Sequence, residues 1–121
     1  MPARLTPADQ AEVLDALARL DAGTAERADL RLLTKHFLAL LVRKAPGGAV
    51  EVRVPPYSAV QVIGGTTHRR GTPPAVVELE ATTWLELALG RLGWAEAVAA
   101  GRVVASGERS DLSPYLPLHL P

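Results

Sequence analysis

The chain has 121 residues, of which 48% are hydrophobic and 21% are charged, with 13 basic and 13 acidic side chains. This length and composition predict one globular domain with a hydrophobic core, and they exclude a disordered chain. The lack of cysteine excludes disulfides, thiolate metal sites and cysteine nucleophiles, and the balanced charge argues against binding to nucleic acid.

Two helices are predicted in the first third of the chain. Residues 6–9 read Thr-Pro-Ala-Asp, which is typical of a helix start, with Thr6 as the N-cap and Pro7 as the first helical residue. Gly23 is the expected end of this helix. A longer helix is predicted over residues 26–44, where hydrophobic side chains cover a broad face, so we expect it to contact more than one layer.

The periodicity then changes from helical to alternating. Residues 50–54 alternate valine with charged side chains, which predicts a half-buried strand. The glycines of residues 64–65 predict a hairpin turn into a short, polar edge strand. Five strands are expected altogether, over residues 50–54, 57–63, 66–70, 75–80 and 102–106.

Two more helices are predicted over residues 82–89 and 94–100, followed by a short final helix from Glu108. This order of elements predicts an α+β fold rather than a doubly wound one. We expect a mainly antiparallel, five-stranded sheet that is covered by helices.

One domain is expected over residues 1–121, with an N-terminal helix in residues 1–23 and the core in residues 24–121. No segment approaches the roughly 18 uninterrupted hydrophobic residues that cross a bilayer. The N-terminus also lacks the hydrophobic region of a secretory signal. We therefore expect a soluble protein of the cytoplasm.

No residue pattern predicts a catalytic or metal-binding site. His36, His68 and His119 have no second histidine or carboxylate at helical spacing, so they form no metal-binding pair. His36 lies beside the hydrophobic stripe of the second helix, where a boundary residue is more common than a ligand. The serines, glycines and aspartates match no nucleophile elbow, phosphate loop or carboxylate pair. We expect no catalytic residues, no metal and no cofactor.

The first candidate binding site is polar. Arg69 and Arg70 stand beside the constrained run Gly-Thr-Pro-Pro of residues 71–74. Two arginines on a rigid edge can hold a carboxylate or a phosphate through paired hydrogen bonds. The alternative is an edge strand protected by its own charges, and this is the more common arrangement.

The second candidate is hydrophobic. Trp84, Leu87 and Leu89 share one predicted helix, and Trp94 begins the next, so both tryptophans of the chain fall in this short region. Such a cluster is more often part of an ordinary core than the wall of a ligand site.

The same region resembles the sterol carrier protein 2 superfamily. The superfamily's L-x-x-G-[KR] helix, A-x-x-x-G-[KR] helix with its following strand, and G-[DE] turn match residues 83–92, 95–103 and 106–109. Residues 50–57 and 68–74 look like small actinobacterial sterol carrier family proteins, and like the C-terminal domain of mycothiol-dependent maleylpyruvate isomerases. The resemblance covers about residues 30–118.

This resemblance implies a five-stranded sheet with helices on one side, enclosing an apolar tunnel for a sterol, a fatty acid or an acyl-CoA. It implies a noncatalytic binding or carrier protein for a lipid-like ligand. The expected wall of the tunnel consists of Phe37, Leu41, Val60, Val62, Trp84, Leu87, Leu89 and Trp94.

Two alternatives stay open. The first is an accessory protein that has the fold without the tunnel and acts as a homodimer through an exposed sheet edge. The second is an accessory subunit of a thiol-dependent isomerase-type enzyme, which lends Arg69 or Arg70 to a metal-containing partner.

Overall fold

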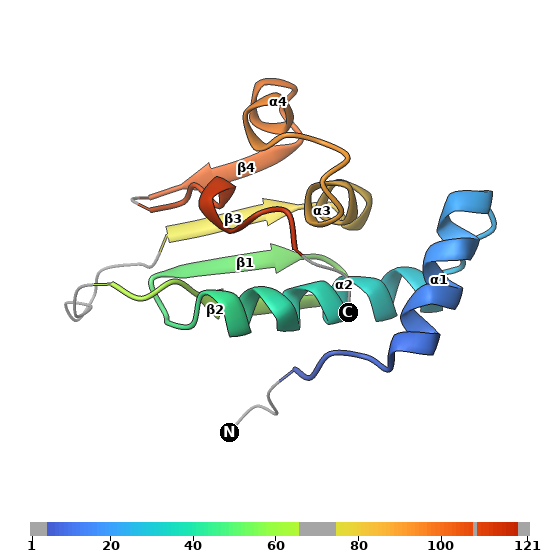
Figure 1. The fold of residues 1–121 in the computed structure, drawn as a ribbon. Helices are drawn as coiled ribbons and strands as arrows, with labels where there is room; N and C mark the ends of the chain where they lie inside the picture. Colours follow the sequence, from blue (N-terminus) through green and yellow to red (C-terminus); the bar gives the residue numbers. More distant parts are fainter. Residues whose placement is uncertain (1–4, 66–74, 108, 119–121) are drawn as a thin grey trace.

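A computed structural model describes residues 5–65, 75–107 and 109–118 (Figure 1). The helices and strands predicted on these residues are present, and the short final helix is found as a 3₁₀ turn. In chain order the elements are α1 (Gln10–Ala22), α2 (Arg27–Lys44), β1 (Val50–Val54), β2 (Ser58–Val62), β3 (Ala75–Leu79), α3 (Ala81–Ala88), α4 (Trp94–Ala99), β4 (Val103–Ser106) and η1 (Ser113–Tyr115).

The strands form one mixed sheet in the order β2-β1-β3-β4. The β1–β2 and β3–β4 pairs are antiparallel, whereas β1 and β3 run parallel. The α+β class and the mainly antiparallel character of the sheet are therefore confirmed. The expected five strands are not matched: the described residues contain four, and the strand expected over residues 66–70 lies outside them.

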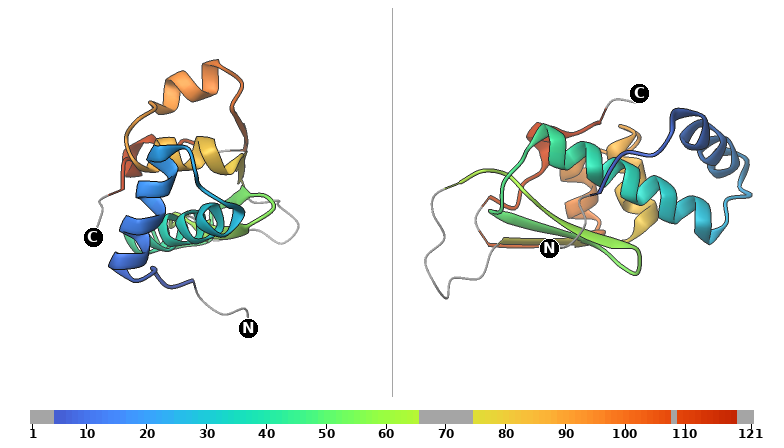
Figure 2. Two further views of the ribbon diagram at one scale, coloured as in Figure 1. Left: turned by 90° about the vertical axis from the view of Figure 1, so that its right-hand side faces the viewer. Right: turned by 90° about the horizontal axis from the view of Figure 1, so that it is seen from below.

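The helices lie on one face of the sheet, which is clearest when the molecule is seen from below (Figure 2, right). The strands bury alternate side chains toward this helical layer, because successive residues of a strand point to opposite faces. In β1, for example, Val50, Val52 and Val54 are fully buried, while Arg53 is exposed on the other face. The hydrophobic core therefore fills the space between the sheet and the helices.

The start of α1 differs from the prediction. Asp9, not Thr6, is the N-cap, and its carboxylate accepts a hydrogen bond from the amide of Ala11 at 3.2 Å. The amide of Ala8 donates instead to the ring of His36 at 3.0 Å, so the chain before Asp9 runs over α2 and is not helical. A tertiary contact has overridden the local capping signal. The predicted end at Gly23 is confirmed by its left-handed φ of 76°.

The last part of the described chain completes the helical layer. Leu112 and Leu118 flank η1, and both are buried in the core. The amide of Leu118 donates to the carbonyl of Ala88 at 2.8 Å, which ties the segment to the end of α3. In Figure 1 this segment crosses in front of the sheet toward α3. Residues beyond the last strand thus belong to the core.

The loop between α2 and β1 is held by Ile63. The amide of Ile63 donates to the carbonyl of Ala45 at 2.7 Å, and its carbonyl accepts from Ala49 at 2.9 Å. Gly47 crosses directly over Ile63 with a φ of 146°. Only glycine has room at this crossing. Gly47 therefore allows the chain to turn from α2 into the sheet.

Candidate functional site

The expected tunnel wall is brought together in space. All eight residues join one hydrophobic cluster, either as buried members or as half-buried neighbours packed against it. Five of them are no more than 1% exposed: Phe37, Leu41, Val62, Trp84 and Leu87. The eight residues therefore lie together in space, and the centre of their cluster is a packed interior.

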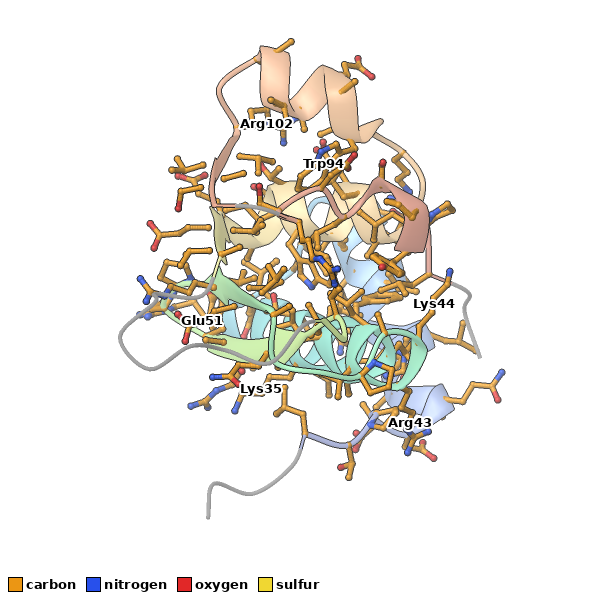
Figure 3. All side chains as sticks on the ribbon, turned by 90° about the vertical axis from the view of Figure 1, so that its left-hand side faces the viewer. Lys35, Arg43, Lys44, Glu51, Trp94 and Arg102 are labelled. Carbon is orange, nitrogen blue, oxygen red and sulfur yellow. The ribbon has the colours of Figure 1, made fainter. Side chains whose placement is uncertain are left out.

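Trp84 is the largest side chain of that interior. Its indole is fully buried, and its ring N–H donates to the carbonyl of Thr34 in α2 at 3.3 Å. This bond orients the ring and ties α3 to α2. The other three predicted residues, Val60, Leu89 and Trp94, lie at the margin of the cluster, and Figure 3 shows Trp94 between α4 and the rest of the domain.

The hollow that we name the seam lies between α1 and α3. It has a volume of about 210 Å³ and is lined by Leu20, Thr82, Leu85, Glu86, Leu89 and Arg91. Leu85 is almost fully buried and belongs to the core, so the floor of the seam is continuous with the hydrophobic interior. Of the eight predicted wall residues, Leu89 lines the seam, and none lines either of two other hollows that are described below.

Two ion pairs hold α1 beside the seam. The Arg91 guanidinium donates to the Asp21 carboxylate at 2.7 and 3.3 Å, and this bond holds the pKa of Asp21 below its usual value. Arg19 donates to both oxygens of Asp29 at 2.8 to 3.0 Å. That contact, together with the backbone amide of Glu26, lowers the pKa of Asp29. No sequence pattern joins Asp21 to Arg91, because the two residues lie 70 positions apart.

The largest of the three hollows is polar. It has a volume of about 580 Å³ and lies between β3, α3 and β4. Glu78, Glu80 and Arg102 are among its lining residues. Arg102 is engaged there, because it donates to the hydroxyl of Thr83 at 3.2 Å and pairs with Glu86 at 3.0 Å. A site with two carboxylates and an occupied arginine suits a hydrophobic ligand less well than the seam does.

His36 is a core residue rather than the boundary residue that we expected. It is 1% exposed, its Nδ1 accepts from the amide of Ala8, and its ring packs edge-on against Phe37 at 5.0 Å. Nδ1 can accept only while it is unprotonated, so the neutral ring is the form that fits. Nε2 has no hydrogen-bond partner among the described residues. Burial lowers the pKa of His36 from its ordinary value of 6.5.

The protein is therefore expected to lose stability as the pH falls below about 6.5. Below this pH the unfolded chain binds a proton on His36, whereas the folded chain keeps the ring neutral. The free energy of unfolding therefore falls by up to about 1.4 kcal/mol for each pH unit. Above that pH both states are neutral, and the contribution of His36 to stability is complete. Urea denaturation from pH 7.5 to pH 5 measures this loss. The variant His36→Asn keeps an acceptor for Ala8 and should flatten the profile, and an unchanged slope would contradict the assignment.

The predicted polar site of Arg69 and Arg70 lies outside the described residues. In the part of the chain that the structure describes, no group of three or more His, Cys, Asp or Glu side chains could hold a metal ion. Within the same part, no helix combines the length and the hydrophobicity that a membrane span requires.

The fold and its interior define the class of protein first: an α+β domain whose helices cover one face of a mixed sheet over a single hydrophobic core. A family model described as bacterial SCP ortholog matches residues 26–118, well over half of the chain. The chain therefore belongs to this family of proteins that are similar to sterol carrier proteins. A search of curated proteins finds no match. The resemblance to maleylpyruvate isomerases stays a prediction.

Proposed function

We propose that the protein binds and carries a lipid-like hydrophobic molecule of the sterol, fatty acid or acyl-CoA class, and does not catalyse a reaction by itself. Membership of the sterol carrier-like family is the observation that carries this proposal. The broad hydrophobic interior between the helices and the sheet supports it, because sites for hydrophobic ligands are lined mainly by hydrophobic and aromatic side chains.

The seam is the proposed opening to the interior. Its floor residue Leu85 adjoins Trp84 along α3, so a chain that enters beside Leu85 and Leu89 reaches the core directly. Its α1 side is held by the pairs Arg19–Asp29 and Asp21–Arg91, which can separate without breaking the hydrogen bonds of a helix. The family match begins after α1, so this helix is an addition to the matched part and is well placed to act as a cover.

Native mass spectrometry of the purified protein, compared with its denatured mass, tests the function directly. We expect a retained mass of a few hundred daltons that disappears on denaturation, and binding of added fatty acid to protein that has been stripped of lipid. Protein that carries nothing and binds no fatty acid, sterol or acyl-CoA would rule the proposal out.

The variant Leu89→Asp tests the seam. A carboxylate among the leucines should weaken fatty-acid binding at least about tenfold, because the hydrocarbon loses a hydrophobic contact and meets a charge. Leu14→Asp is the matched control, since Leu14 lies on α1 and is 50% exposed. Titration with a fluorescent fatty acid, with circular dichroism as a check on folding, distinguishes the two. Equal effects of both variants would remove the seam from the proposal.

A homodimer is the second candidate, and one observation favours it. Strand β4 is an edge of the sheet in the described structure, Val104 is 66% exposed there, and none of its four residues is charged. Edge strands are usually protected by charges or prolines. The same native mass spectrum reports this outcome as a doubled mass.

The third candidate, an accessory subunit that lends Arg69 or Arg70 to an enzyme, predicts activity only after mixing with that partner.

A further inference from the structure

Three basic side chains form a stripe along one side of α2. Arg27, Arg31 and Lys35 follow each other at intervals of four residues, which places them one above the other on a helix. The stripe is roughly 12 Å long at a rise of about 1.5 Å per residue. Lys35 and Lys44 leave α2 on opposite sides, so the stripe is separate from the basic end of the helix (Figure 3).

The arginines of this stripe border a hollow. It has a volume of about 290 Å³ and is lined by Arg27, Ala28, Arg31, Pro56 and Tyr57. The small side chain of Ala28 leaves the surface of the helix open between the two guanidiniums. The facing wall is the turn between β1 and β2, which is closed by a hydrogen bond from the amide of Tyr57 to the carbonyl of Val54 at 2.9 Å.

The guanidiniums in this hollow are not used by the fold. The side chains of Arg27 and Arg31 form no hydrogen bond or ion pair with any described residue, whereas the side chains of Arg19, Arg53, Arg91 and Arg102 each pair with a carboxylate. The nearby carboxylate of Asp29 is occupied by Arg19 and by the amide of Glu26. Glu26 is the acidic residue next to Arg27 in the sequence, and one carboxylate against three basic side chains leaves the stripe with a net positive charge.

From this arrangement we infer that the hollow is a binding site for a phosphate group, held between Arg27 and Arg31 and against the ring of Tyr57. Guanidiniums bind phosphate through paired hydrogen bonds, and two of them on neighbouring helical turns suit a doubly charged anion better than a single carboxylate. Lys35 extends the stripe beyond the reach of one phosphate, which favours a diphosphate or a row of lipid headgroups. The inference does not depend on the proposed carrier function.

Isothermal titration with inorganic pyrophosphate tests the inference, and a cosedimentation assay with phosphatidylglycerol vesicles runs beside it. The double variant Arg27→Gln/Arg31→Gln should weaken binding about tenfold, and added salt should weaken the wild type in the same way. Arg43→Gln is the matched control: Arg43 is exposed, has no ion pair among the described residues and lies at the other end of α2.

The two arms separate the sources of the phosphate. Binding of pyrophosphate alone identifies a soluble phosphorylated ligand, and binding of the vesicles, with none to phosphatidylcholine vesicles, identifies a lipid headgroup. Either result supports the site if it is lost in the double variant and kept in Arg43→Gln. Binding in neither arm, or an equal loss in the control, overturns it. Circular dichroism excludes unfolding as the cause, and all three substituted residues are on the surface.

Discussion

Replacing Trp84 by alanine is expected to lower the free energy of unfolding by about 3 to 5 kcal/mol. The indole is fully buried, and it is the largest of the fully buried side chains among the described residues. The substitution also removes the hydrogen bond from α3 to the carbonyl of Thr34. Urea denaturation followed by circular dichroism measures the loss.

The second tryptophan supplies the control for this prediction. Trp94 is only half-buried at the margin of the cluster, so Trp94→Ala should cost less than half as much. Trp84→Phe keeps most of the side-chain volume, so its loss in free energy of unfolding should lie between those of the two alanine variants. A cost below about 1 kcal/mol for Trp84→Ala would mean that the interior around α3 is loosely packed, as expected of an empty ligand cavity.

Replacing Gly47 by alanine should destabilise the protein by at least about 3 kcal/mol. The new Cβ would stand 2.2 Å from the carbonyl oxygen of Ile63, and the φ of 146° is one that side chains rarely adopt. Because the clash is with backbone, no side-chain rotation relieves it. Thermal unfolding measures the effect as a lower melting temperature.

Gly48 is the matched control, one residue further along the same loop. A Cβ there would meet only the flexible side-chain oxygen of Gln61, at 3.2 Å, so Gly48→Ala should cost less than about 1 kcal/mol. If both variants were equally stable, the crossing of Gly47 over Ile63 would not be the constraint that closes this loop.

The elements could be predicted because their signals are local. Alternating valines marked β1, and the broad hydrophobic face marked α2 within one residue of its observed start. The parallel pairing of β1 with β3 could not be read in this way, since it joins segments that are far apart in the sequence. The start of α1 was misplaced for the same reason, because His36 takes the amide of Ala8 from 28 residues away.

The candidate sites divide along the same line. Hydrophobicity alone gathered Phe37, Trp84 and Leu87 into one cluster, because burial drives such residues together. Whether they enclose a space depends on how their volumes fit, which no pattern of residue types specifies. The pair Arg27 and Arg31 gives no local signal, because its members are not adjacent in the sequence. The helix places both on one side, and the β1–β2 turn forms the opposite wall of the hollow that they line.

The mixed sheet also has a consequence for the order in which the chain folds. Strand β1 reaches its antiparallel partner β2 across residues 55–57, whereas its parallel partner β3 follows only after residues 55–74. Closing the shorter loop costs less chain entropy, so the β1–β2 hairpin can form early and offer its free side to β3. The pairing of β3 with β1 is then expected to come later, and it brings α3 with Trp84 against α2.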